Sequence, residues 1–552
     1  MKNNEDTSTS DTNLGRRNLL KSAFVGGVVA AAMPGLAREN IFHSLNRPVA
    51  PSDLDEITLA ELQSGLRSGK FTARSIAEAY LKRIAEIDKR GPAVNSMIEL
   101  NPDALEIADS LDREMKEKGP RGPMHGIPVV IKDNISTADK MLTTAGSLAL
   151  VGSKPPEDSF VVRQLRKSGA VILGKTNLSE WANIRSSHST SGWSGRGGLT
   201  RNPYALDRNT SGSSSGSAVA ASANLSSLAI GTETDGSIVS PSSINGVVGI
   251  KPTVGLVSRT GIIPISHSQD TAGPIARSVR DAAILLGAMV GVDPRDKASR
   301  ASKGKFHSDY TRFLDADGLE GARLGVVRGY FGFLPKVDEV IDGAIDAMRK
   351  KGAVIIDPVE FKTLAKWGDA EETVLAYELK ADMNKYLATL GPNQPMHTLA
   401  DLIRFDDEHK TTEMLYFGQD FFLKAEACGP LTDMKYIAAR EKCIRLTRKE
   451  GIDAVMTRYN LDALVAPTDS PGWMTDLILG DHSIGGSSSA AAVAGYPDIT
   501  VPAGFIFGLP VGISFFGRAW SEPKLIKLAY AFEQATKARR APKFLPTADL
   551  KV

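Results

Sequence analysis

The sequence predicts an α/β protein built as one large domain. Short apolar runs of strand length alternate with segments of helical periodicity, and most of these runs end in glycine, lysine or other polar residues. No internal repeat and no long low-complexity linker divides the chain. The 552 residues, 42% of them apolar, suffice for an extended core, and large α/β units can be continuous over such a length. We therefore assign one domain to residues 52–545.

The first 37 residues predict a targeting segment that is not part of this fold. Arg16 and Arg17 precede an apolar stretch from Ala23 to Met33, and small residues follow as far as Ala37. This stretch is too short to span a bilayer, whereas paired arginines before such a stretch are typical of a twin-arginine export signal. An amphipathic or disordered tail is the alternative. We expect the twin-arginine export machinery as a partner, cleavage near Ala37, a linker at 38–51, and a periplasmic or secreted protein without stable membrane association.

Composition limits the partners and cofactors. Sixty-six basic and 64 acidic residues leave a net charge of +2, so no overall field draws the chain to nucleic acid or to an anionic membrane. The eight histidines form neither HxxxH nor HExxH, which argues against a dedicated zinc site. Cys428 and Cys443 exclude a disulfide framework but not a single bridge. We expect a small neutral or mixed-charge substrate, with no metal and no organic cofactor.

The predicted domain opens with helices and continues into strands. Thr58 and Glu61 form a capping box, and a helical pattern of apolar residues follows through residue 87. Four runs within residues 122–260 predict strands, and this region forms the core of the domain: IPVVI before Lys132, AVIL before Gly174, SLAI before Gly231 and VVGI before Lys251.

The second half of the domain returns to the same sheet. Residues 280–455 are richer in charge and in helical periodicity, which predicts peripheral helices that cap the substrate side. Three further apolar runs predict that residues 456–545 add strands to the sheet: LDALVAP (461–467), ITVPAG (499–504) and VGISFFG (511–517).

Three residues predict a hydrolase with a serine nucleophile. Lys132 ends an apolar run. Ser213 lies in the segment GSSSGS, 81 residues further along the chain, and Ser237 lies in the segment GTETDGS, 24 residues after Ser213. A lysine at a strand end is commonly a snorkelling charge. Burial, however, lowers the pKa of a lysine from about 10.4 and makes a neutral amine available as a base. We therefore interpret Lys132 as the base, Ser213 as a relay hydroxyl and Ser237 as the nucleophile.

The loop before Ser237 predicts an oxyanion hole. Its small residues allow several backbone N–H groups to turn toward one point. The candidate donors are the amides of Thr234, Asp235, Gly236 and Ser237 itself.

Two other motif matches are rejected. Gly169 to Thr176 satisfies the P-loop pattern, but Ala170–Leu173 predicts a strand whose amides pair within a sheet and cannot cradle phosphate. Ser214 stands at the centre of a GxSxG pattern, but a nucleophile elbow requires a buried strand immediately before it, and residues 200–211 are polar and turn-prone.

The motifs together resemble the amidase-signature family. The stretch from Gly212 to Arg259 carries most of the resemblance, supported by HGIPVVIKDNI, GKTNLSEWAN and AGYPDITVPAG. The resemblance implies an α/β fold with a mixed central sheet covered by helices. It also implies that Lys132 is the base, that Ser213 is a relay serine in a cis peptide bond, and that Ser237 is the acylated nucleophile. The commoner loop of the family is GTDTGGS. This chain has Glu233 in place of the aspartate and Asp235 in place of the first glycine of the GGS end.

Within that family, GWSGRGGLTRNPY (192–204), GTETDGS and the segment that begins at Asn101 are similar to the bacterial peptide-amidase branch. The resemblance implies hydrolysis of the C-terminal carboxamide of peptides with release of ammonia. An amidase for small aliphatic or aryl amides is the first alternative, and an exported binding protein with an inactive amidase fold is another. An amidotransferase component that works on charged tRNA is disfavoured by the export signal and by the absence of a basic surplus. Trp181, Trp193 and Tyr204 are aromatic candidates for substrate contact, although packing explains each of them better.

Overall fold

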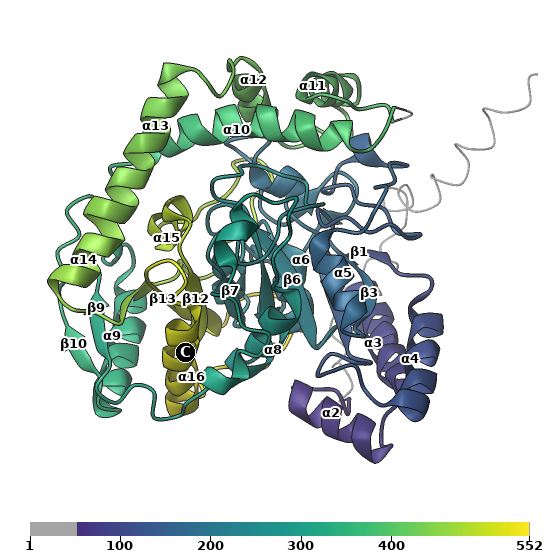
Figure 1. Cartoon of the computed structure of the whole chain (residues 1–552), viewed down its shortest axis with the longest axis horizontal. Coiled ribbons are helices and arrows are strands. Elements are labelled where there is room, and N and C mark those ends of the chain that lie inside the picture. The colour runs from purple at the N-terminus through teal and green to yellow at the C-terminus, as the bar shows by residue number, and fades with distance from the viewer. Residues whose placement is uncertain (1–51, 393, 551–552) are drawn as a thin grey trace, which may run out of the picture. The chain divides into compact units, whose positions relative to one another are not determined.

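The central element of the fold is a mixed sheet of eleven strands (Figure 1). A computed structural model describes residues 52–392 and 394–550, which form one compact unit. The strand order is β1-β3-β2-β6-β8-β7-β12-β13-β11-β9-β10. The strands are β1 Met97–Leu100, β2 Pro128–Lys132, β3 Val171–Thr176, β6 Leu228–Glu233, β7 Val248–Lys251, β8 Thr271–Ala276, β9 Arg323–Val326, β10 Val354–Ile356, β11 Ala463–Pro467, β12 Asp498–Ile506 and β13 Leu509–Phe516. The predicted α/β class, with a single large domain around a mixed sheet, is confirmed.

Parallel pairing of β2 with β6 brings the candidate residues to one edge of the sheet. Val129 is opposite Leu228 and Ile131 is opposite Ile230, so the two strands end side by side. Because functional loops of α/β sheets follow the carboxyl ends of parallel strands, Lys132 and the loop after Glu233 share this edge. Every residue of both strands is buried. The apolar strands therefore hold the polar ends in fixed positions.

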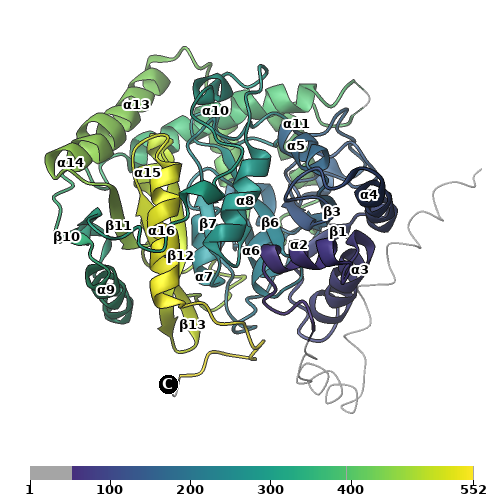
Figure 2. The same cartoon turned by 60° about the horizontal axis from the view of Figure 1, so that its bottom comes forward.

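Helices surround this sheet. They are α2 Leu59–Ser68, α3 Ala73–Arg83, α4 Ala104–Lys118, α5 Phe160–Lys167, α6 Ser215–Ser222, α7 Val239–Ile244, α8 Val279–Met289, α9 Pro335–Lys350, α10 Gly368–Ala388, α11 Leu399–Glu408, α12 Asp420–Glu426, α13 Met434–Ile444, α14 Asp453–Arg458, α15 Ser488–Ala494 and α16 Glu522–Thr536. The capping box of Thr58 and Glu61 begins α2 as predicted. Helix α16 packs on β12 and β13 and contacts both α8 and α9, and Figure 2 shows α16 and α8 in front of the sheet.

The helical region at residues 280–455 is more than a peripheral layer, which corrects the prediction made for it. It contains β9 and β10, which pair in parallel with each other, and β9 also pairs with β11. These strands have four and three residues, too few to show a pattern of alternation in the sequence. Strand β8 was not predicted either, because Gly273 and Pro274 within it are typical of turns.

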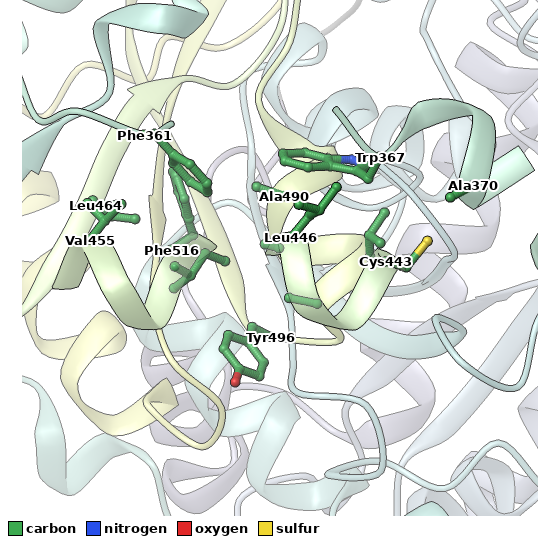
Figure 3. Close-up of a cluster of buried hydrophobic side chains, with 14 of the residues drawn as sticks. Phe361, Trp367, Ala370, Cys443, Leu446, Val455, Leu464, Ala490, Tyr496 and Phe516 are labelled. Atoms are coloured by element: carbon green, nitrogen blue, oxygen red, sulfur yellow. The ribbon is translucent and has the colours of Figure 1, made fainter. Parts of the chain in front are cut away.

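Helix α10 is held between two apolar clusters. In one of them, Trp367 and Val374 pack with residues of α13, β13 and α15, including Cys443 and Phe516 (Figure 3). In the other, residues from Ala376 to Leu387 pack with Trp181 and with residues of α12. Figure 1 shows α10 across the top of the view, with α11 and α12 above it and with α13 and α14 descending on the left. The two clusters thus hold both halves of α10 in place.

The predicted export signal (1–37) and most of the predicted linker (38–51) lie outside the described residues. Among the helices of residues 52–392 and 394–550, none combines the length and the apolar character needed to cross a membrane.

Candidate active site

Lys132 is enclosed at the end of β2. Its side chain has no exposed surface. The Nζ atom lies 2.8 Å from Ser213 Oγ, 3.0 Å from Ser214 Oγ and 3.1 Å from the Thr232 carbonyl oxygen. Two donated bonds and one accepted bond suit a neutral amine, which has two N–H groups and one lone pair. Because the hydroxyl of Ser214 itself donates to the Thr232 carbonyl at 3.0 Å, Ser214 and Thr232 can accept both N–H groups and leave the lone pair to the Ser213 hydroxyl.

The environment of Lys132 favours this neutral form. Burial lowers the pKa of Lys132 from 10.5 to about 7, and the charges of Glu233 and Asp270 offset only part of the effect. Desolvation penalises the ammonium form because a buried charge loses its hydration. The lysine is therefore available as a base near neutral pH, as its burial was expected to make it.

Ser213 lies in the turn that leads into α6. The Gly212–Ser213 peptide bond is cis, as the family resemblance implied. The Ser213 carbonyl accepts from the Ser179 N–H at 3.1 Å, and the side chain is completely buried. The turn is thereby fixed both to the loop at residue 179 and to Lys132.

Ser237 follows a loop whose backbone donors are unused. Within the described part of the chain, no protein group accepts from the backbone N–H groups of residues 234 to 237. Gly236 has φ +79°, and a Cβ there would meet Ser488 Oγ at 3.1 Å, so this turn requires glycine. Ser237 is 8% exposed, whereas Lys132 and Ser213 are inaccessible. This geometry is what an oxyanion hole beside a reachable nucleophile needs.

The Glu233 side chain stabilises the loop that carries Ser237. Its Oε2 atom accepts from the N–H groups of Ile238 and Val239 at 2.7 and 3.1 Å, at the start of α7. Burial raises the pKa of Glu233, while Lys251 and the two N–H groups act against that effect. Because the Glu233 side chain binds the N–H groups of Ile238 and Val239, the intervening residues 234–237 form a loop between the two ends of this contact.

The structure joins two of the three predicted catalytic residues directly. Lys132 and Ser213 are within hydrogen-bond distance, but no hydrogen bond joins the hydroxyls of Ser213 and Ser237 among the described residues. Their loops meet through the backbone, because the Ser214 N–H donates to the Ser237 carbonyl at 3.2 Å. The proton relay between the two serines stays a prediction.

The two rejected motif matches have structural roles. Residues 171–176 form strand β3, and the buried Lys175 donates to the Ile135 carbonyl at 2.7 Å and to Thr143 at 2.8 Å. Ser214 follows an irregular segment and not a strand, and its hydroxyl contacts Lys132.

The aromatic candidates are packing residues in this structure. Trp181 is buried against Phe422, Trp193 lies between Tyr416 and Phe417, and the Tyr204 hydroxyl donates to the Arg540 carbonyl at 2.5 Å. Cys428 and Cys443 are both free thiols.

Sequence reasoning missed the groups that surround the loop of Ser237. Asp270 accepts from Thr234 Oγ1 at 2.6 Å, and burial raises the pKa of Asp270 to about 6. Gln269 donates to the Thr234 carbonyl at 3.2 Å and to Glu371 at 3.0 Å. None of these residues belongs to a recognisable motif, and only the fold brings them to the loop.

Comparisons with known proteins find relatives over most of the chain. The family model named Amidase matches residues 75–526. A protein of Arabidopsis thaliana described as a probable amidase is 43% identical over 502 residues, which are 89% of this chain and 92% of that protein. A putative amidase of Schizosaccharomyces pombe is 38% identical over 518 residues, 89% of this chain and 87% of that protein.

A solved structure of peptide amidase from Stenotrophomonas maltophilia is 52% identical, with a TM-score of 0.85 over 90% of this chain and all of that chain. A family model that covers most of the chain and long relatives above 30% identity show membership of the family. The chain therefore belongs to the amidase family, as an amide hydrolase with the amidase-signature fold.

Proposed function

We propose that this amide hydrolase removes the C-terminal carboxamide of peptides and releases ammonia through an acyl-enzyme on Ser237. One observation carries the catalytic part of the proposal: Lys132, buried and with a pKa of about 7, lies 2.8 Å from Ser213 beside a loop with four unused N–H donors. The peptide substrate is inferred from the likeness to a peptide amidase at 52% identity over almost the whole of both chains.

Acylation begins with two proton transfers. Neutral Lys132 accepts a proton from Ser213 while Ser213 accepts one from Ser237, and Ser237 Oγ forms a bond to the amide carbon. A rotation of the Ser237 side chain when substrate binds completes this relay. The N–H groups of Thr234, Asp235, Gly236 and Ser237 hold the negative oxygen of the tetrahedral intermediate. The relay then runs backwards, protonates the leaving nitrogen and expels ammonia.

Deacylation repeats the sequence with water as the nucleophile. Water loses a proton through the same relay and attacks the ester, and Ser237 leaves with the proton returned from Lys132. The products are the peptide acid and free enzyme. Burial of Lys132 and Ser213 keeps bulk water away from the relay, while Ser237 stays open to the substrate.

The test is ammonia release from a panel of amidated peptides, small aliphatic amides and aryl amides, with free-acid peptides scored for internal cleavage. We expect rapid release from peptide amides and no internal cleavage. Ser237→Ala and Lys132→Ala should lower the rate at least about 100-fold. The matched control is Ser217→Ala, which removes a buried hydroxyl group of α6 that does not belong to the proposed relay. Turnover of Ser237→Ala near the wild-type rate refutes the mechanism, and a preference for small or aryl amides refutes the substrate.

We also propose that residues 1–37 direct twin-arginine export to the periplasm or the medium. The support is the arginine pair before a short apolar stretch. In cell fractionation, Arg16→Lys together with Arg17→Lys should retain the full-length protein in the cytoplasm, whereas Lys21→Arg should not. Unchanged export of the doubly substituted chain contradicts the proposal.

A further inference from the structure

Two carboxyl groups meet beside the loop that carries Ser237. Asp235 belongs to this loop, and Glu371 lies in the first turn of α10. Their side chains are hydrogen-bonded to each other. Gln269 Nε2 donates to Glu371 Oε1 at 3.0 Å, and Ser488 Oγ donates to Asp235 Oδ1 at 2.5 Å. Each carboxyl group thus accepts a hydrogen bond from a further side chain, and these bonds hold the two groups in place.

The pair contains one proton and one negative charge. Two carboxylates have only acceptor atoms, so a hydrogen bond between them needs a proton. Burial, and then the charge of Asp235, raise the pKa of Glu371 well above its usual range. Glu371 therefore keeps the proton and donates it to Asp235.

The surroundings offset this charge only in part. Among the described residues, the titratable groups that interact with Asp235 or Glu371 include Glu233, Lys251, Tyr330 and Cys443. Lys251 is the one cation in that set, and it also faces the carboxyl groups of Glu233, Asp498 and Glu522. Because Lys251 is shared with these other carboxyl groups, it offsets the negative charge of the pair only in part.

Asp235 stands close to the reacting carbon. It is two residues from Ser237, so their Cα atoms are at most about 7 Å apart. Asp235 is also partly exposed beside a nucleophile that solvent can reach. A carboxylate held by the N–H groups of this loop meets a like charge at short range, whereas a carboxamide is neutral and does not.

We propose that Asp235, supported by Glu371, makes the site select carboxamides against carboxylates, so that free-acid chain ends are rejected and the acid product leaves. This inference rests on the proposed function, because it assumes that the neutral amide is the substrate. Glu371 acts through Asp235 and is a positioning residue, since it supplies the proton of the pair.

Two isosteric variants separate charge from shape. Glu371→Gln replaces a protonated carboxyl by an amide that can still donate to Asp235, so the pair keeps one negative charge. Asp235→Asn combined with Glu371→Gln has the same shape and no charge. The single Asp235→Asn is unsuitable as the uncharged form, because it leaves Glu371 as a second ionisable carboxyl group in the pair.

The experiment measures binding of N-acetyl-phenylalaninamide and of N-acetyl-phenylalanine by titration calorimetry at pH 8. All proteins are full chains that also contain Ser237→Ala, so that no amide is consumed. We expect the amide to bind at least about tenfold more tightly than the acid in the Ser237→Ala protein and in its Glu371→Gln derivative. The ratio should fall toward one in the uncharged derivative, mainly because the acid binds better.

An equal ratio in the charged and uncharged derivatives overturns the inference, and so does the absence of measurable amide binding. If the uncharged derivative does not fold, Asp235→Gly in the Glu371→Gln background removes the same charge. The proposed function is tested separately by ammonia release from the wild-type enzyme. A charge-dependent ratio without turnover of peptide amides refutes that function alone, whereas turnover with an unchanged ratio refutes this inference alone.

Discussion

The Nζ atom of Lys132 and the Oγ atom of Ser213 lie 2.8 Å apart, although 81 residues separate them in the chain. Neither side chain has exposed surface. A base and its hydroxyl partner that share a dry site exchange a proton without reorganising solvent. In the mechanism that we propose, the lysine takes the place that a histidine holds in most serine hydrolases.

The pH dependence of the rate should report the pKa of Lys132. The base works only as a neutral amine, and burial sets its pKa at about 7. We expect kcat/KM to fall about tenfold for each pH unit below 7 and to level off above it. Rates between pH 5.5 and 8.5 measure this, with the residual rate of Lys132→Ala as a control that should lack the inflection. A flat wild-type profile across this range contradicts the assignment.

Ser214 should affect the rate by orienting the Lys132 amine. Its hydroxyl lies 3.0 Å from Lys132 Nζ and also donates to the Thr232 carbonyl, so it orients the amine without reaching the substrate. We expect Ser214→Ala to lower kcat about tenfold with little change in KM, and to move the inflection of the pH profile. Ser217→Ala, whose hydroxyl instead contacts Thr176 at 2.7 Å, should leave the profile in place. Identical pH profiles for Ser214→Ala and the wild type would show that Ser214 does not orient the Lys132 amine.

Glu233 should determine how well the loop holds an oxyanion. Glu233→Ala removes the acceptor of the Ile238 and Val239 N–H groups, so the loop can change conformation. The backbone N–H groups of residues 234–237 then no longer point toward one position. The expected loss is about 10- to 100-fold in kcat with KM nearly unchanged. Glu233→Gln keeps an acceptor oxygen in place and should retain most of the activity. Equal losses in the two variants would show that the charge of Glu233, and not its hydrogen bonds, is what counts.

A buried arginine should carry much of the stability near the site. Arg185 is fully buried, lies 2.8 Å from Glu180, and donates to the carbonyl groups of Glu413, Phe417 and Gly418. Arg185→Met leaves these carbonyl acceptors without their donor and removes the cation beside Glu180, at a cost of about 3 to 5 kcal/mol in the free energy of unfolding. Urea unfolding measures this cost. Arg67→Met, in the last turn of α2, is a surface control that should change it by less than about 0.5 kcal/mol. A cost below about 1 kcal/mol for Arg185→Met is incompatible with the role assigned to it.

Local patterns in the sequence predict the residues whose role depends on their neighbours in the chain. The strand before Lys132 and the loops of Ser213 and Ser237 show as apolar runs and as Gly/Ser-rich turns, and the fold confirms their elements. The partners of the nucleophile loop are different. Glu371 is 136 residues from Asp235, and nothing in its helix distinguishes it from the Glu372 beside it. Such contacts depend on tertiary packing, which one sequence does not reveal.

The position of β12 and β13 has a consequence for how the enzyme matures. These strands come near the end of the chain, yet β12 pairs with β7 and β13 pairs with β11, so they join two groups of strands made earlier. A nascent chain that already contains Lys132, Ser213 and Ser237 therefore still has a divided sheet. Ser488, which binds Asp235, also arrives late. We therefore expect activity to appear only when synthesis is almost complete, because a fragment released early contains all three residues but not the strands that join the two parts of the sheet.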